Sequence, residues 1–103
     1  MNTEPLKAMF NPPHPGEFLA ATYLAELGIS ARTLASALGV APTSLTRILN
    51  GQGRVTSEMA VRLERVLGRS AMSWMRMQDS YDLWQARQIV NIENLQPLVV
   101  QAA

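Results

Sequence analysis

Residues 30–51, SARTLASALGVAPTSLTRILNG, constrain the fold of this 103-residue chain more than any other stretch. The first part of this stretch, residues 31–38, repeats apolar side chains at the spacing that places them on one face of an α-helix. Ser30 offers an oxygen to the unpaired N–H groups of a first helical turn, and Gly39 follows the last apolar residue. The pattern therefore predicts a short helix with a marked beginning and a marked end.

A second helix follows after a tight turn. Gly39 can adopt a left-handed backbone without a Cβ penalty, and Val40 can fill the gap between the two helices. Pro42 suits the first turn of a helix, because its missing N–H would have no partner there. Leu45, Ile48 and Leu49 form the inward face of this helix. The stretch therefore predicts a helix-turn-helix.

The outward face of the second helix has little apolar bulk and carries Thr43, Ser44, Thr46 and Arg47. Small residues let a helix enter the major groove of DNA, and hydroxyl groups can bond bases or phosphates. An arginine can pair with both acceptors of guanine, O6 and N7. These side chains therefore predict a helix that reads DNA.

An ordinary helical hairpin with a solvated polar face is the alternative, and the charge distribution favours the DNA interpretation. The chain has a net charge of +1, yet residues 27–57 hold Arg32, Arg47 and Arg54 and no acidic residue. Phosphate contact requires such a local basic patch. We expect Arg47 to contact a base, and Arg32 and Arg54 to contact phosphates. The predicted DNA-binding residues are Arg32, Thr43, Ser44, Thr46, Arg47, Asn50 and Arg54.

Composition argues against several other functions. The chain has no cysteine and one histidine, His14, so disulfides, a Cys/His zinc site and thiol catalysis are excluded. No nucleophile-base pair and no paired carboxylates stand out, so we expect no enzyme, no cofactor and no bound metal. We interpret His14 as a helix cap. No apolar run reaches the length of a transmembrane helix and no signal peptide is evident, which favours a cytoplasmic protein without membrane contact.

Hydrophobic periodicity outside the helix-turn-helix predicts three more helices, over residues 14–27, 57–67 and 71–88. Thr56 and Ser70 are predicted to cap the last two. We therefore expect an all-α fold of five helices. The expected parts are an N-terminal arm over residues 1–13, a DNA-binding domain over residues 14–69, and a C-terminal helix and tail over residues 70–103 that form a dimer.

Two smaller expectations concern surface segments. Gly51 and Gly53 would let the loop after the second motif helix approach another group closely, and we interpret that group as a DNA phosphate. Three arginines lie on and just after the next helix, namely Arg62, Arg65 and Arg69. Neighbouring glutamates offset their charge, so we interpret them as a solvated face.

The helix predicted over residues 71–88 contains Trp74, Tyr81 and Trp84, half of the six aromatic residues of the chain. Its apolar side chains fall on two sides, which is more than a helix needs to cover one core. We interpret one side as packing on the bundle and the other as packing on a second chain, because interfaces are rich in aromatics and methionine. An intramolecular core alone is the alternative. The predicted dimer residues are Trp74, Met77, Tyr81, Leu83 and Trp84.

Three blocks of the chain resemble known families. The helix-turn-helix resembles the lambda-repressor and Cro-like pattern at Leu34, Ala35, Leu38, Gly39, Val40, Leu45 and Ile48. Two further blocks resemble the signature of HigA-type antitoxins, namely His14-Pro15-Gly16-Glu17 and the set Trp74, Gln78, Tyr81, Asp82 and Leu83. The order and spacing of the three blocks agree over residues 14–86. Ala41 departs from the Ser or Thr that often precedes the second motif helix in the family.

The resemblance implies a function as well as a fold. It implies a five-helix, lambda-repressor-like domain with a C-terminal dimerisation helix. It also implies a homodimer that binds operator DNA in its own promoter and neutralises a HigB-type toxin, a messenger-RNA-cleaving ribonuclease of the RelE-like fold. Two-fold symmetry predicts an inverted repeat with half-sites about one helical turn apart. A stand-alone repressor without a toxin partner is the alternative.

Overall fold

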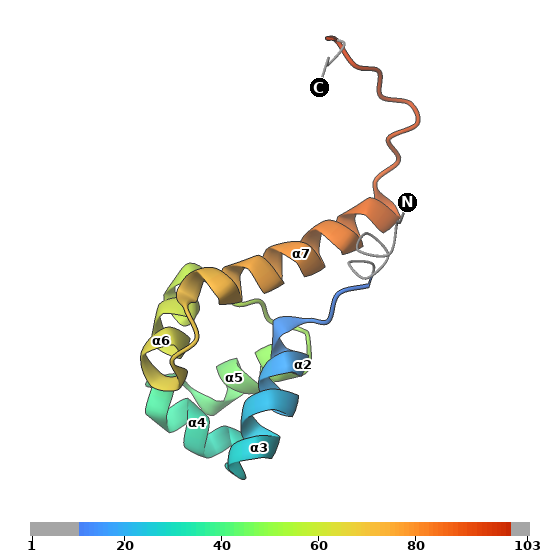
Figure 1. Cartoon of the computed structure of the whole chain (residues 1–103). Coiled ribbons are helices and arrows are strands. Elements are labelled where there is room, and N and C mark those ends of the chain that lie inside the picture. Colours follow the sequence, from blue (N-terminus) through green and yellow to red (C-terminus); the bar gives the residue numbers. More distant parts are fainter. Residues whose placement is uncertain (1–10, 100–103) are drawn as a thin grey trace, which may run out of the picture.

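The structure, a computed structural model, describes residues 11–99, and this part of the chain is helical without any strand (Figure 1). The elements in chain order are α2 (Pro15–Leu19), the π-helical segment η1 (Ala20–Leu24), α3 (Ala25–Leu27), α4 (Ala31–Leu38), α5 (Pro42–Leu49), α6 (Ser57–Leu67) and α7 (Ala71–Ile89). The first three follow one another without a break, so the predicted five-helix, all-α fold is confirmed. Most of the predicted arm, residues 1–10, lies outside the described residues.

Four helices begin with a side-chain cap, and the sequence predicted all four. The hydroxyls of Ser30, Thr56 and Ser70 each accept a hydrogen bond from the backbone N–H three residues later. Ala41, in the corresponding position before α5, supplies no such bond. Helix α5 therefore begins on Pro42, whose ring needs no partner for an N–H.

The core lies between the helices and reaches into α7. Its buried apolar residues are Leu19, Leu34, Ala35, Leu38, Leu45, Ile48, Val55, Met59, Ala60, Leu63 and Trp74. Trp74 is 0% exposed and packs edge-on against the ring of Phe18, with 5.8 Å between ring centroids. The first half of α7 is therefore part of the same core as the helices before it. Trp74 has no surface to offer a second chain, which corrects its predicted place in a dimer interface.

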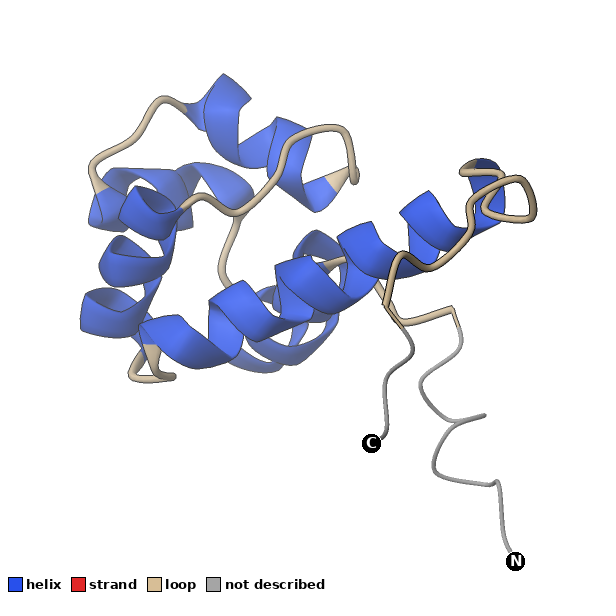
Figure 2. Cartoon of the chain, turned by 90° about the horizontal axis from the view of Figure 1, so that it is seen from above, coloured by secondary structure: helices blue, strands red, loops and turns tan. Residues whose placement is uncertain are grey.

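One end of α7 packs on the bundle while the other extends beyond it (Figures 1 and 2). The helix ends at Ile89, and residues 90–99 continue without helix or strand. Several large apolar side chains are exposed on this extension, namely Leu83, Ile89, Val90, Ile92, Leu95, Leu98 and Val99. None of the described helices is long and apolar enough to cross a membrane.

Two arginines of the predicted solvated face also have structural partners within the chain. Arg62 Nη1 donates a hydrogen bond of 2.8 Å to the carbonyl oxygen of Leu38, one of the unpaired acceptors at the end of α4. The guanidinium carbon of Arg69 lies 4.8 Å from the ring centroid of Phe18, a cation–π contact. Arg65 and Arg69 are exposed, as predicted, and Arg62 is paired with Glu58 at 3.3 Å. The additional contacts to Leu38 and Phe18 were not predicted, because these partners lie far away in the sequence.

Candidate nucleic-acid interface

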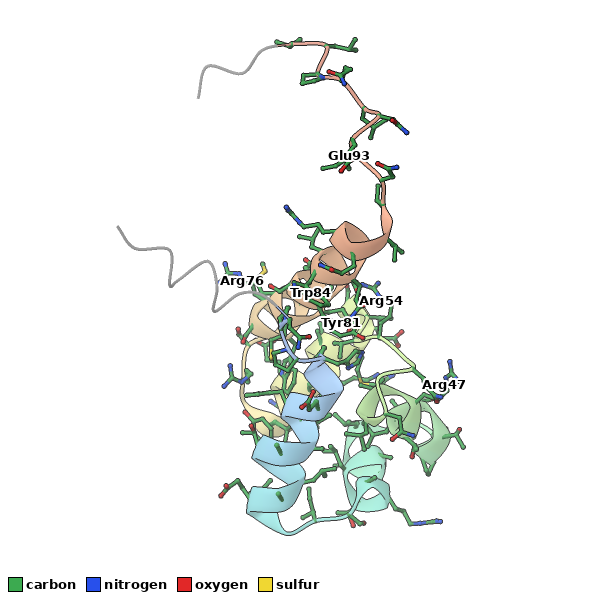
Figure 3. The ribbon with its side chains drawn as sticks, turned by 90° about the vertical axis from the view of Figure 1, so that its right-hand side faces the viewer. Arg47, Arg54, Arg76, Tyr81, Trp84 and Glu93 are labelled. Carbon is green, nitrogen blue, oxygen red and sulfur yellow. The ribbon has the colours of Figure 1, made fainter. Side chains whose placement is uncertain are left out.

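Helix α5 separates its apolar and polar residues cleanly. Leu45 is 0% exposed and Ile48 is 5% exposed, so both belong to the core. The residues predicted to read DNA, Thr43, Ser44, Thr46 and Arg47, are all exposed. Figure 3 shows Arg47 at the edge of the molecule, pointing away from the other helices. Helix α5 thus presents one polar face of short side chains and a single long cation to solvent.

The turn before α5 fixes how this helix sits on α4. Gly39 adopts a left-handed backbone with φ of 72°, as predicted. Val40 is half-buried, and its N–H donates a hydrogen bond of 3.0 Å to the carbonyl oxygen of Ala35. Arg62 of α6 adds its bond to the last turn of α4. The angle between the two motif helices is therefore set by the backbone hydrogen bond of the turn, the half-buried side chain of Val40 and the side-chain bond from Arg62.

The loop after α5 folds back onto the last turn of that helix. The N–H groups of Gln52 and Gly53 both donate to the carbonyl oxygen of Arg47, each at 2.8 Å. A Cβ atom on Gly53 would lie 3.3 Å from the Cβ of Arg47, so the absence of a side chain permits this close approach. The loop therefore does approach another group closely, as predicted. Within the chain, that group is the last turn of α5.

Helix α2 contacts the same region from the other side. A Cβ atom on Gly16 would lie 1.8 Å from the carbonyl oxygen of Ile48, so no other residue type fits there. His14 Nδ1 accepts a hydrogen bond of 2.9 Å from the Gly16 N–H, which confirms that this histidine caps the helix. The His14-Pro15-Gly16 block therefore lets the first turn of α2 press against the end of α5.

His14 also joins α7 to the loop after α5. Its ring packs edge-on against Tyr81 with 4.9 Å between centroids, and it hydrogen-bonds the backbone of Gly53. Burial lowers the pKa of His14 below 6.5, and this outweighs the Gly53 hydrogen bond and the charges of Asp82 and Glu17, which raise it. His14 is therefore held in its neutral form at neutral pH.

Two polar residues of α7 complete the contacts to the loop. Gln78, which is 1% exposed, accepts a hydrogen bond of 2.7 Å from the Val55 N–H through its Oε1 atom. Its Nε2 atom donates to Asp82 Oδ1 at 3.0 Å, and Asp82 Oδ2 forms an ion pair with Arg54. Sequence reasoning gave Gln78 and Asp82 no role beyond the family signature. Their spacing of one helical turn was the signal that they could act together.

The seven predicted DNA-binding residues are all exposed, and they occupy two regions. Thr43, Ser44, Thr46, Arg47, Asn50 and Arg54 lie on α5 and on the loop that follows it. Arg32 lies apart from them, in the first turn of α4. Among the described residues, no group of three histidine or carboxylate side chains is arranged to hold a metal ion.

The other predicted dimer residues differ in exposure. Leu83 is 55% exposed, whereas Met77, Tyr81 and Trp84 are partly buried within the chain. Tyr81 packs on His14 and Met77 packs against the core. Leu83 is therefore the predicted dimer residue with the most free surface.

Comparisons with known proteins agree with this geometry. Residues 21–74 match a family model described as Helix-turn-helix. The Escherichia coli protein YddM, described as an uncharacterized HTH-type transcriptional regulator, is 37% identical over 90% of this chain and 98% of its own length. The structure of the antitoxin GraA has a TM-score of 0.82 at 38% identity, over 86% of this chain and 99% of that chain.

A further solved structure is that of the Pseudomonas aeruginosa antitoxin HigA with the higBA promoter. It has a TM-score of 0.77 at 36% identity, and the match covers 85% of this chain and 99% of that one. Both antitoxin structures thus match most of the chain, well beyond the helix-turn-helix itself. This chain therefore belongs to the lambda-repressor-like helix-turn-helix family, among its HigA-type antitoxins.

Proposed function

We propose that this protein is a homodimeric antitoxin that binds operator DNA, represses its own operon and neutralises a HigB-type ribonuclease toxin in the cytoplasm. The observation that carries the proposal is the outward face of α5. Its short hydroxyl side chains and Arg47 are all exposed, while its apolar residues are buried. Such a helix can enter a major groove without steric hindrance from its own side chains.

Phosphate contacts by Arg32 and Arg54 would supply most of the affinity. Arg32 lies in the first turn of α4, and Arg54 lies in the loop after α5. Cations near a reading helix can neutralise the backbone phosphates that border the groove. Asn50, exposed at the end of α5, can bond to a phosphate or to a base edge.

The dimer would form through the C-terminal helix and tail, residues 70–103, while residues 14–69 carry the contacts to DNA. Leu83 is exposed on α7, and further apolar side chains are exposed beyond it. The free energy falls when a second copy covers an apolar surface of this kind and removes it from water. A two-fold dimer places two copies of α5 on one side of the molecule, which suits an inverted repeat in the DNA.

The toxin partner is supported by the family alone. GraA and the Pseudomonas aeruginosa protein are both named antitoxins, and the structure of the latter contains its promoter. The alternative is a stand-alone repressor without a toxin. It is supported by the description of the Escherichia coli relative as an uncharacterized transcriptional regulator. Neither function requires catalysis by this chain.

Co-expression separates the two candidates. The chain is tagged, expressed with the product of any small reading frame beside its gene, purified through the tag and sized. A stable complex of fixed stoichiometry supports the antitoxin. If the chain elutes alone as a dimer and still binds the DNA upstream of its gene, the stand-alone repressor is correct. If it neither forms a complex nor binds that DNA, both proposals are wrong.

A further inference from the structure

A chain of three polar contacts connects α7 with the loop after α5. The N–H of Val55 donates to Gln78, Gln78 donates to Asp82, and Asp82 pairs with the guanidinium of Arg54. Val55 is 0% exposed, so its N–H would have no water to bond if Gln78 were absent. The inner end of the chain of contacts is therefore fixed by a buried backbone group.

The orientation of each member follows from the one before it. Because the oxygen of the Gln78 amide is committed to Val55, its nitrogen must face Asp82. That nitrogen engages one carboxylate oxygen of Asp82 and leaves the other oxygen for Arg54. The position of an exposed arginine is thus set by a backbone contact inside the protein.

A contribution to folding stability does not account for the ion pair between Arg54 and Asp82. The side chains of Arg54 and Asp82 are 53% and 41% exposed, and ion pairs exposed to this degree contribute little to folding. Asp82 also places a negative charge beside a cation that is expected to meet phosphates, which by itself would weaken binding to DNA. A benefit to binding is therefore the better explanation of the contact.

We propose that Asp82 is a positioning residue that holds Arg54 in the conformation that contacts a DNA phosphate. This inference rests on the proposed DNA-binding function. Arginine has five N–H donors, so a guanidinium paired with Asp82 through one nitrogen keeps donors free for a phosphate. A free arginine loses side-chain entropy when it binds, and one that is already held loses less.

The substitution Asp82→Asn tests the proposal with little change in shape. Gln78 still presents its amide nitrogen, so the oxygen of the new amide must face Gln78 and its nitrogen must face Arg54. Two donors would then face each other, and Arg54 would be released. We expect the dissociation constant for a duplex of the DNA upstream of the gene to rise about two- to tenfold.

A double-mutant cycle distinguishes positioning from other effects. Arg54→Ala, Asp82→Asn and the double variant are compared with the unaltered full chain on the same duplex. Once Arg54 is removed, we expect Asp82→Asn to cause no further loss of affinity, and the loss of its negative charge should strengthen binding slightly. The coupling energy is the difference between the effects of Asp82→Asn with and without Arg54, and any loss of folded protein common to the two backgrounds cancels in it. Asp79→Asn, which removes another exposed carboxylate of α7, is the matched control and should leave affinity unchanged.

Three outcomes contradict the proposal, and each does so differently. Tighter binding by Asp82→Asn would mean that Asp82 acts only as a repulsive charge. An equal loss in the Arg54→Ala background would mean that Asp82 acts through the fold. Failure of the unaltered chain to bind the duplex at any salt concentration would contradict the proposed function itself, and the inference with it.

Discussion

Gly16 of α2 lies so close to Ile48 of α5 that a Cβ atom on it would be 1.8 Å from the Ile48 carbonyl oxygen. Substitution of this glycine forces backbone away from backbone, because no flexible side chain can move aside. We expect Gly16→Ala to lower the free energy of unfolding by ~1–3 kcal/mol, the usual cost of an overpacked contact. Chemical denaturation measures the change. The neighbouring exposed substitution Glu17→Ala should have little effect, and equal stability of the two variants would contradict the contact.

Arg47 is the residue expected to distinguish one base from another. Arg47→Ala should cost ~1–3 kcal/mol on the cognate operator and relax the preference at one base pair. Competition binding against a panel of single-base operator variants measures both effects. Arg65→Ala removes an exposed arginine of α6 and serves as the control. Equal losses on operator and unrelated DNA would show that Arg47 contacts a phosphate instead.

Arg32 is expected to contact a phosphate and therefore to act on all DNA alike. Arg32→Ala should weaken binding to operator and unrelated duplexes by similar factors. The slope of log affinity against log salt should become shallower by about 0.9, the value for one lost phosphate contact. Titrations at several salt concentrations measure the slope. An unchanged slope would place Arg32 outside the interface.

His14 should make the stability of the fold depend on pH. Its pKa is lowered in the folded state by burial, so the unfolded chain binds the proton more readily. The stability that His14 contributes is therefore fully present above pH 6.5 and is lost as pH falls through the folded pKa. Thermal unfolding between pH 7.5 and pH 5.5 measures the loss. His14→Asn keeps an acceptor for the Gly16 N–H and removes the titration, so its melting temperature should change less over the same range.

Leu83 should govern association of two chains. Leu83→Glu places a charge on an exposed apolar position of α7, which a dimer interface would have to bury without a partner. We expect the variant to shift from dimer to monomer in sedimentation or light scattering and to lose affinity for an inverted repeat. Val61→Glu on α6 changes a residue of similar exposure, 59%, and is the control. A dimeric Leu83→Glu protein would exclude this part of α7 from the interface.

Local patterns in the sequence predicted most of the helices correctly. The bounds of α4 and α6 and the capping roles of Ser30, Thr56 and Ser70 followed from residues next to one another in the chain. The exposed face of α5 followed from its 3.6-residue period. The π-helical segment η1 was not predicted, since its residues, AATYL, are compatible with an ordinary α-helix.

Contacts between distant parts of the chain were not predictable in the same way. Arg62 bonds to Leu38, and Gln78 bonds to Val55, across more than twenty residues. Each of these side chains resembles a solvated polar residue when only its neighbours in the sequence are considered. Their roles became visible once α6 and α7 had been placed against the helix-turn-helix.

Helix α7 carries Trp74, Gln78 and Leu83 on one continuous helix, which connects the core, the loop after α5 and an exposed apolar surface. If a second copy that packs on Leu83 shifts α7, the backbone that Gln78 holds shifts with it. Any resulting change in affinity for DNA is reciprocal, because linkage then requires DNA to alter the affinity of the two copies for each other by the same factor.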